Sequence, residues 1–210
     1  MNSHAGNEAI DRSIREYYEN KLKTHGANHK GMDWSTKESQ VVRFEQLTKV
    51  ITPANLFSII DYGCGYGSLL DYLIKKRNKF QYCGYDISKE MILTARRKYG
   101  DNSKRRIFIS DETKLLPADY VIASGIFNVK LDYSSRKWEL RALKTINKMN
   151  KLSRRGFSFN MLTKYSDFTR KDLYYGDPLL YFDYCKKNIS KNVALLHDYK
   201  LYDFTIIVRK

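Results

Sequence analysis

A run of alternating glycines, Asp61-Tyr62-Gly63-Cys64-Gly65-Tyr66-Gly67, joins two segments of different character. Residues 57–62 form a short apolar run typical of a buried strand, and residues 68–76 have the spacing of an amphipathic helix. Glycine lets the chain turn tightly and lets a ligand approach the bare backbone. The N–H groups at the start of the following helix favour a negatively charged group. The stretch therefore predicts a strand–loop–helix unit whose loop binds a ligand.

Two details of this loop distinguish between the ligands it could hold. A dinucleotide-binding loop follows G-x-G-x-x-G, and its third glycine would fall at position 68, where the chain has Ser68. Asp61 stands two residues before the first glycine, where a carboxylate opposes a pyrophosphate but attracts an ammonium group. S-adenosylmethionine carries an ammonium group beside a carboxylate. The loop therefore favours this ligand and disfavours an NAD-dependent oxidoreductase.

The next two predicted strands also end in acidic residues. Asp86 follows the second strand, and a carboxylate there can accept both hydroxyls of a ribose. Ile87 comes next and is suited to lie against an adenine face. Asp111 and Glu112 follow the third strand and offer acceptors for the exocyclic amino group of adenine. Together with Asp61 and the glycines, these successive strand ends predict a nucleoside site.

Strands and helices alternate along the rest of the chain. Ser35, with Glu38 three residues later, has the capping-box pattern of a helix start, and Ser88 is expected to cap another helix. A tight turn at Tyr199 and Lys200 is expected to join the last two strands. The pattern predicts an α/β fold with a doubly wound, seven-stranded, mostly parallel sheet of Rossmann-like type and a C-terminal antiparallel hairpin. The strands are expected at 57–62, 80–85, 106–110, 119–127, 156–162, 193–199 and 201–208, and the helices at 9–22, 35–50, 68–76, 88–99, 135–151 and 178–188.

The composition is that of one compact globular domain. The 210 residues are 42% hydrophobic and 29% charged, too apolar for a disordered chain and too charged for a membrane bundle. No apolar run approaches the roughly 20 residues that span a bilayer, and the first residues do not resemble a secretory signal. Cys64, Cys83 and Cys185 are an odd number without close pairing. They argue against a disulfide framework or a metal site and indicate a cytoplasmic location.

The chain is strongly basic, with 38 Lys and Arg against 23 Asp and Glu and a net charge of +15. This excess suggests nucleic acid, an anionic surface or an acidic substrate as a partner. The dense basic groups lie at predicted helix ends or just before strands, where they complement the helix dipole. In a doubly wound sheet those places share the edge opposite the acidic strand ends. We therefore expect mainly a solvated basic underside, formed by residues 75–79, 96–98, 104–106, 148–155 and 186–191.

An acid with alternating glycines, followed by acids at the next two strand ends, resembles the class I S-adenosylmethionine-dependent methyltransferases. The resemblance covers about residues 55–210, including the terminal hairpin. It implies that the loop binds the methionine part of S-adenosylmethionine and that Ser124, after the fourth strand, lies next to the sulfonium. The cofactor-binding residues expected in this core are Asp61, Gly63, Cys64, Gly65, Gly67, Asp86, Ile87, Asp111, Glu112 and Ser124.

More loosely, the whole chain resembles small bacterial methyltransferases that modify sugars or other small metabolites. Residues 1–52 would then form an N-terminal helical lid over a core at 53–210. In such a lid Tyr18, Trp34 and Arg43 could reach the cofactor, with Arg43 as the partner of its carboxylate. The alternative is that Trp34 and Arg43 only anchor a helix.

The acceptor end of the site is less well defined by the sequence. Methyl transfer is an in-line displacement, so the protein mainly aligns the acceptor, and a base helps when the acceptor is a hydroxyl or ammonium. Candidate catalytic residues near the ends of later strands are His197, Asn128 and Tyr175. An imidazole can take a proton near neutral pH, although His197 also fits a packed structural role. The Asn/Asp-Pro-Pro-Tyr/Phe signature of nucleic-acid amino methylation does not follow the fourth strand.

Three functions remain open at this point. The first is a methyltransferase acting on O or N of a small polar metabolite such as a sugar. The second is an RNA methyltransferase, which predicts basic residues on the cofactor face and binding that weakens steeply with salt. The third is a non-catalytic binding module, which the intact loop at 61–67 opposes. Under the first function, apolar pocket walls are expected from Phe127, Tyr165, Phe168, Tyr174 and Tyr175.

Overall fold

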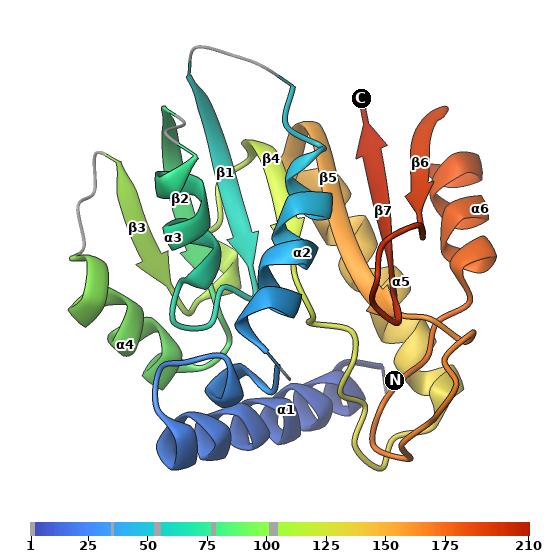
Figure 1. The fold of residues 1–210 in the computed structure, drawn as a ribbon, viewed down its shortest axis with the longest axis horizontal. Coiled ribbons are helices and arrows are strands. Elements are labelled where there is room, and N and C mark those ends of the chain that lie inside the picture. Colours follow the sequence, from blue (N-terminus) through green and yellow to red (C-terminus); the bar gives the residue numbers. More distant parts are fainter. Residues whose placement is uncertain (1–2, 35, 53–55, 77–78, 101–104) are drawn as a thin grey trace.

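A seven-stranded sheet between two layers of helices organises the chain in the computed structural model, which describes residues 3–34, 36–52, 56–76, 79–100 and 105–210 (Figure 1). The strands lie in the order β3-β2-β1-β4-β5-β7-β6. Their bounds are β1 Phe57–Tyr62, β2 Phe80–Tyr85, β3 Arg106–Ile109, β4 Ala118–Ala123, β5 Ser153–Leu162, β6 Asn192–Leu196 and β7 Asp203–Arg209. The helices are α1 Ser3–His25, α2 Lys37–Thr48, α3 Ser68–Lys75, α4 Lys89–Tyr99, α5 Ser135–Leu152 and α6 Pro178–Asn188, with short 3₁₀ turns η1 Lys30–Met32 and η2 Glu112–Lys114.

The strand directions confirm the predicted doubly wound, mostly parallel sheet. β1 to β5 pair in parallel, whereas β7 is antiparallel to both of its neighbours, β5 and β6. The carboxyl ends of β1 to β5 therefore meet at one edge of the sheet, where ligands of open α/β sheets bind.

Several strand boundaries differ from the predicted ones, among them the start of β5 at Ser153, the end of β4 and the connection between β6 and β7. β4 stops at Ala123, not at 127, because Gly125 takes a φ of 75° and leaves the extended conformation. Its N–H donates to the side chain of Asn160 on β5 at 2.9 Å instead. The predicted tight turn before β7 is a longer connection through residues 197–202, in which the hydroxyl of Tyr199 is hydrogen-bonded to that of Thr205 at 2.8 Å.

The helix starts follow local capping signals. The hydroxyl of Ser88 accepts the N–H of Met91 at 3.1 Å, so the predicted cap of α4 is confirmed. Ser35, the predicted cap of α2, lies outside the described residues, and the hydroxyl of Thr36 caps the helix by accepting the N–H of Ser39 at 3.0 Å. α1 is longer than the predicted 9–22 and ends at His25.

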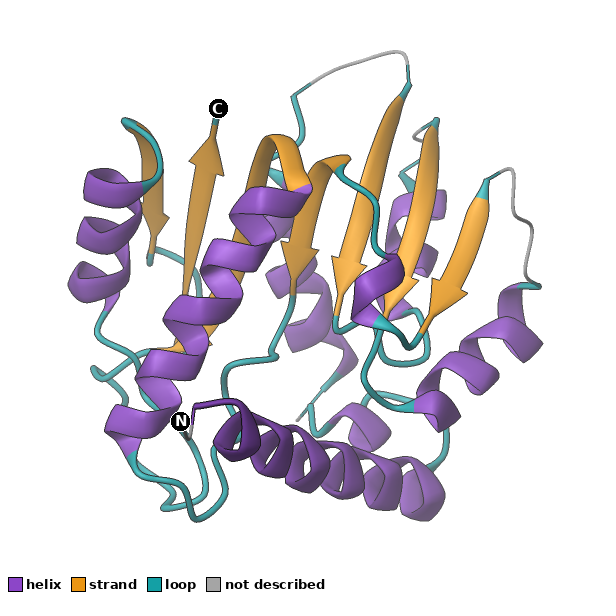
Figure 2. Ribbon diagram, turned by 180° about the vertical axis from the view of Figure 1, so that it is seen from behind, coloured by secondary structure: helices purple, strands orange, loops and turns teal. Residues whose placement is uncertain are grey.

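The two faces of the sheet carry separate cores. Phe44 and Leu47 of α2 pack with Leu70 of α3 on one face, which also carries α4. α5 and α6 cover part of the other face, and Ile10 and Ile14 of α1 join that second core (Figure 2). α1 itself runs across the edge where the parallel strands end (Figures 1 and 2). The two helices within residues 1–52 thus occupy different places: α2 packs on the sheet, and α1 covers its carboxyl edge.

Candidate active site

The glycine loop after β1 adopts a conformation that residues with a Cβ rarely reach. Gly63 and Gly65 have φ values of 83° and 52°. A Cβ on Gly63 would lie 2.2 Å from Cγ2 of Ile126, which follows β4. The N–H groups of Gly63 and Cys64 donate to the carbonyl of Tyr85 at 2.7 and 2.9 Å. The loop is therefore fixed between the ends of β2 and β4.

Asp86 connects this loop to the start of α4. Its Oδ2 accepts the N–H of Gly65 at 2.8 Å, and its Oδ1 accepts the N–H of Ser88 at 2.9 Å. Burial raises the pKa of Asp86 to about 6, although both backbone donors act to lower it. Each carboxylate oxygen has a second lone pair, so Asp86 can still accept hydrogen bonds from a ligand.

A large cavity opens at the carboxyl edge, beneath α1. Its empty volume is about 1070 Å³, which includes open solvent at its mouth. Concave sites at the carboxyl ends of parallel strands are where open α/β sheets bind ligands. Its walls include six of the predicted cofactor-binding residues, namely Trp34, Gly63, Asp86, Ile87, Glu112 and Ser124. The structure therefore brings residues from four strand ends and from the N-terminal segment around one space.

A smaller pocket adjoins this cavity and shares Ser124 with it. Asp61 and Cys64 line the smaller pocket, and Asp61 is only 2% exposed. The carboxylate accepts the hydroxyl of Tyr82 at 2.7 Å, and no basic side chain in the described ranges pairs with it. Burial raises the pKa of Asp61 to about 7. The hydroxyl of Ser124 is buried without a hydrogen-bond partner among the described residues. A buried acid beside an unsatisfied hydroxyl suits a cationic hydrogen-bond donor.

Two further residues of the glycine loop, Gly67 and Cys64, shape the backbone and the pocket wall. Gly67 is the N-cap of α3 with a φ of 90°, and a Cβ there would lie 2.7 Å from the ring of Tyr99. Burial raises the pKa of the Cys64 thiol well above its usual range, so this residue is a small neutral wall of the pocket.

Of the two acids after β3, the structure places one at the cavity. Glu112 lines it, accepts a hydrogen bond from the hydroxyl of Tyr62 and forms an ion pair with Lys148. Asp111 points elsewhere: its exposed carboxylate caps η2 by accepting the N–H of Thr113 at 3.0 Å. Of these two predicted adenine-binding residues, Glu112 lines the cavity and Asp111 is absent from its described walls.

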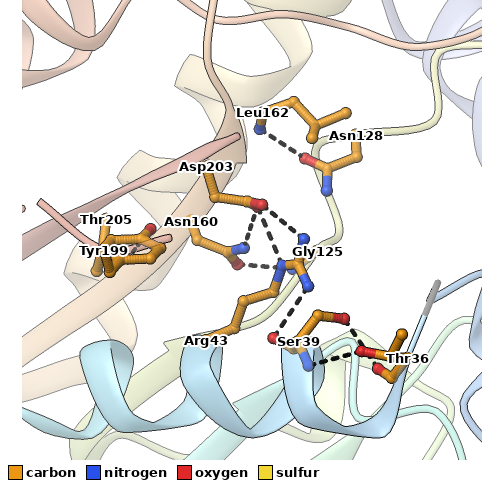
Figure 3. A network of polar contacts seen from close by, with 10 residues as sticks. All are labelled: Thr36, Ser39, Arg43, Gly125, Asn128, Asn160, Leu162, Tyr199, Asp203 and Thr205. Atoms are coloured by element: carbon orange, nitrogen blue, oxygen red, sulfur yellow. Dashed lines mark hydrogen bonds and ion pairs between the residues drawn. The ribbon is translucent and has the colours of Figure 1, made fainter. Parts of the chain in front are cut away.

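Arg43 is occupied within the protein. Its Nη2 and Nε donate to the carboxylate of Asp203 at 2.6 and 3.2 Å (Figure 3). Its guanidinium also lies 4.3 Å from the ring centre of Trp34. Arg43 is absent from the walls of both cavities, which are built from described residues. Gln40, one turn earlier on α2, lines the smaller pocket instead and is 7% exposed. These contacts favour the alternative that Arg43 anchors a helix and does not reach the cofactor.

The three candidate catalytic residues lie outside the walls of both cavities, as far as the described residues define them. His197 is exposed, with its ring 6.0 Å from that of Tyr165. Asn128 is 7% exposed, and its side-chain oxygen accepts the N–H of Leu162 at 3.1 Å. The hydroxyl of Tyr175 accepts the N–H of Arg170 at 3.1 Å.

Most of the cavity walls that α1 and α5 contribute were not expected from the sequence. On α1, Tyr18 was expected near the cofactor, whereas Asp11 and Ile14 were not. On α5, the unexpected wall residues include Arg141, Lys144 and Lys148. The spacing of these three basic residues places them on one helix face, which is a signal the sequence contained. Lys148 was expected on the basic underside, but α5 crosses the sheet and brings it to the cavity. Arg141 pairs with Asp11 at 2.8 Å.

The described residues contain no cluster of three or more side chains suited to bind a metal ion. In the same residues, no helix has the length and apolar character that a membrane span requires.

Comparison with known proteins identifies the family. A family model described as "Methyltransferase domain" matches residues 60–151. The chain is 49% identical over 164 residues to the Mycobacterium tuberculosis (strain ATCC 25618 / H37Rv) protein named "Putative methyltransferase Rv1506c", a match that covers 77% of this chain and 98% of that protein.

Two solved structures share the fold at low sequence identity. A Leishmania major S-adenosylmethionine-dependent methyltransferase has a TM-score of 0.64 and 14% identity, with 96% of this chain and 83% of that one covered. Human N-acetylserotonin methyltransferase has a TM-score of 0.59 and 12% identity, with 96% and 66% covered. With the glycine loop, the acidic strand ends and the strand order, these matches show that the chain belongs to the methyltransferases with the class I, S-adenosylmethionine-dependent fold.

Proposed function

We propose that this protein transfers the methyl group of S-adenosylmethionine to an oxygen or nitrogen atom of a small polar metabolite, with a sugar as the acceptor class. The observation that carries the proposal is the cavity at the carboxyl edge, with the glycine loop and Asp86 in its walls and α1 across it. Asp11 pairs with Arg141 at 2.8 Å, and Glu19 accepts the hydroxyl of Ser88 at 2.9 Å, so α1 is held over the cavity from both ends. A covered cavity favours a small acceptor.

The residues present fit S-adenosylmethionine. This cofactor supplies a sulfonium-bound methyl group that is already activated for transfer. Asp61 and the unsatisfied hydroxyl of Ser124 offer acceptors to its ammonium group, and Asp86 offers acceptors to its ribose. Ile87 provides an apolar contact for the adenine, and Glu112 an acceptor for its amino group.

Residues 1–52 form the proposed lid, in which α1 is the covering part. Tyr18 and Trp34 of this segment line the cavity. Phe44 and Leu47 anchor the segment on the sheet through α2. The core at 53–210 supplies the rest of the site.

An aromatic surface beyond β5 is the proposed acceptor platform. It consists of Tyr165, Phe168, Tyr202 and His197, at the same edge of the sheet as the cavity. The first three side chains are 58%, 61% and 39% exposed. Phe127 and Tyr174, also expected as pocket walls, are buried in the core instead. Phe127 follows the turn at Gly125, and the hydroxyl of Tyr174 is hydrogen-bonded to that of Tyr181 at 2.9 Å.

Two of the basic residues near this platform are paired with acids. Lys164 pairs with Asp177 at 2.8 Å, and Arg170 pairs with Asp172 at 2.5 Å. Exposed rings beside paired charges support a sugar, whose apolar C–H face can pack on an aromatic ring, more than a phosphodiester chain, whose binding relies on many unpaired basic residues.

His197 is the proposed general base, because its exposed imidazole lies within the platform and a neutral imidazole nitrogen can accept a proton. Asn128 and Tyr175 are proposed to shape the acceptor loops: the main-chain carbonyl of Asn128 accepts the N–H of Tyr174 at 2.7 Å. The three free cysteines support the cytoplasmic location inferred from the sequence.

An RNA methyltransferase is the second candidate, and one observation favours it. Arg141, Lys144 and Lys148 line the cavity, as an RNA-binding face would require. Carboxylates already pair with Arg141 and Lys148, however, which leaves little positive charge for a phosphate backbone.

A tritiated-methyl transfer assay separates the two candidates. We expect label to enter one member of a nucleotide-sugar and free-sugar panel and not bulk RNA. Replacing Tyr165 and Phe168 together by Ala is expected to raise the KM for that acceptor about tenfold or more, since each ring loses about 1 kcal/mol of packing. Label that enters RNA alone, with binding that falls steeply between low and high salt, would overturn the sugar assignment.

The raised pKa of Asp61 predicts proton release when S-adenosylhomocysteine binds. Folding raises this pKa from 3.8 to about 7, so the folded ligand-free protein retains a proton that the unfolded chain loses within that window. The ligand-free protein should therefore lose stability as the pH rises through the window. The ammonium group of the ligand favours the carboxylate, so binding at pH 6.5 should release a fraction of a proton and weaken at lower pH.

Calorimetry at pH 6.5 in two buffers of different ionisation enthalpy measures this release. In Asp61→Asn, the proton release on binding should fall to the smaller contribution of Asp86, whose pKa is about 6. Equal proton release by the wild type and by Asp61→Asn would separate Asp61 from the ammonium site.

A further inference from the structure

A closed ring of buried contacts links α2, β7 and β5 to the chain segment that follows β4. Its members are Arg43, Asp203, Asn160, Gly125 and Trp34, and Figure 3 shows all of them except Trp34. Two of the members, Gly125 and Trp34, line the larger cavity. The other three lie outside the described walls of both cavities.

The ion pair in this ring is deeply buried. Arg43 is 7% exposed and Asp203 is 0% exposed. Two guanidinium nitrogens bind the two carboxylate oxygens, and Nη1 of Arg43 donates to the carbonyl of Ser39 at 3.0 Å. A buried ion pair contributes little more to stability than an apolar pair of the same volume would. Stability alone is therefore a weak reason for its presence.

Asp203 also fixes the side chain of Asn160. The carboxylate can only accept, so it binds the amide nitrogen of Asn160, at 2.8 Å. This orientation turns the amide oxygen of Asn160 toward Gly125, whose N–H donates to it at 2.9 Å. The main chain next to Ser124 is thus held through one side chain by a carboxylate on β7.

The other half of the ring holds Trp34. The guanidinium of Arg43 lies 4.3 Å from the indole ring centre, and a Cβ on Gly125 would lie 2.3 Å from the same ring. The indole is therefore confined between Arg43 and the backbone of Gly125. Since Trp34 lines both cavities, any shift of the ring changes the walls of the cofactor site.

We propose that Asp203 is a positioning residue for cofactor binding, which through Asn160 sets the Gly125 main chain and through Arg43 sets the Trp34 ring. The proposal rests on the proposed cofactor site. It assigns a role to a residue on the last strand of the sheet, far along the chain from the glycine loop, and it explains why the charge of Arg43 is directed away from the cavity.

Two single variants test the two halves of the ring in the full chain. Asn160→Ala removes the contact to Gly125 and leaves the ion pair in place. Arg43→Lys keeps the charge but loses the planar, two-pronged contact and the stacking on Trp34. We expect each to weaken S-adenosylhomocysteine binding about tenfold by calorimetry and to raise the KM for S-adenosylmethionine more than it lowers kcat.

Ser158→Ala is the matched control. Ser158 is fully buried on β5, and its hydroxyl donates to the carbonyl of Leu47 on α2 at 2.8 Å, so it also joins α2 to the sheet but is absent from the ring. We expect this variant to lower the melting temperature of the ligand-free protein at least as much as Arg43→Lys does, with unchanged affinity for S-adenosylhomocysteine.

The outcomes distinguish positioning from simple stabilisation. If Ser158→Ala weakens binding as much as the ring variants do, or if the ring variants bind as the wild type does, the positioning role of Asp203 is wrong while the cofactor site stands. If the wild type does not bind S-adenosylhomocysteine at all, the proposed cofactor site fails and the positioning role fails with it.

Discussion

Replacing Asp86 by Ala should weaken the binding of S-adenosylhomocysteine at least about a hundredfold. The carboxylate lines the cavity at the end of β2, and its oxygens are available to the two ribose hydroxyls. A hydrogen bond to a charged group contributes about 1.5–3 kcal/mol, so the loss of two such bonds amounts to about 3 kcal/mol or more. Asp86→Asn retains one acceptor oxygen and should fall between Asp86→Ala and the wild type. Calorimetric titration measures all three.

Asp111→Ala is the matched control for this prediction. Asp111 also follows a strand at the carboxyl edge, but its carboxylate is exposed and caps η2. Its removal should leave the affinity for S-adenosylhomocysteine unchanged. An affinity that falls equally in both variants, or in neither, would remove Asp86 from the ribose site.

Gly63→Ala should both destabilise the protein and abolish tight cofactor binding. The φ of 83° costs a residue with a Cβ about 1–2 kcal/mol, and contact with the stiff, β-branched Ile126 at 2.2 Å adds about 1–3 kcal/mol. Ile126 lines the cavity, so the displacement that relieves the contact also deforms the site. Denaturant unfolding should show a loss of about 2–5 kcal/mol in the free energy of unfolding.

Gly100→Ala separates backbone strain from the steric contact. Gly100 has a φ of 69° and a ψ of 164° at the end of α4, a backbone region almost confined to glycine, but a Cβ there meets no atom within 4 Å among the described residues. This variant should lose about 1–3 kcal/mol from backbone strain alone and bind S-adenosylhomocysteine as the wild type does. Equal destabilisation by the two substitutions would mean that the loop after β1 can relax away from Ile126.

The parts of the site that follow from short-range pattern were predictable from the sequence. The glycine loop, Asp86 and the cap at Ser88 each depend on a few neighbouring residues and on a strand whose end is visible as an apolar run. The doubly wound, mostly parallel sheet was predictable on the same basis, because alternating strands and helices restrict a sheet to few topologies.

The parts that depend on long-range contacts were not predictable. The sequence left open whether Arg43 reaches the cofactor or anchors a helix; its partner is Asp203, 160 residues away, and no local pattern indicates that pairing. Asp111 and Glu112 are adjacent, and the η2 turn alone determines which of them faces the cavity. Lys148 was predicted at the edge opposite the cofactor from its place near the end of a helix. The long helix α5 instead brings it to the cavity, so that prediction is wrong.

The most direct test of the account is a crystal structure of the full chain with S-adenosylhomocysteine. We expect the ribose on Asp86, the ammonium group beside Asp61 and Ser124, and the adenine beside Ile87 and Glu112, after β2 and β3, with α1 across the opening. A ligand bound elsewhere on the protein, or a glycine loop closed over the pocket so that Asp61 cannot contact it, would contradict the central claim.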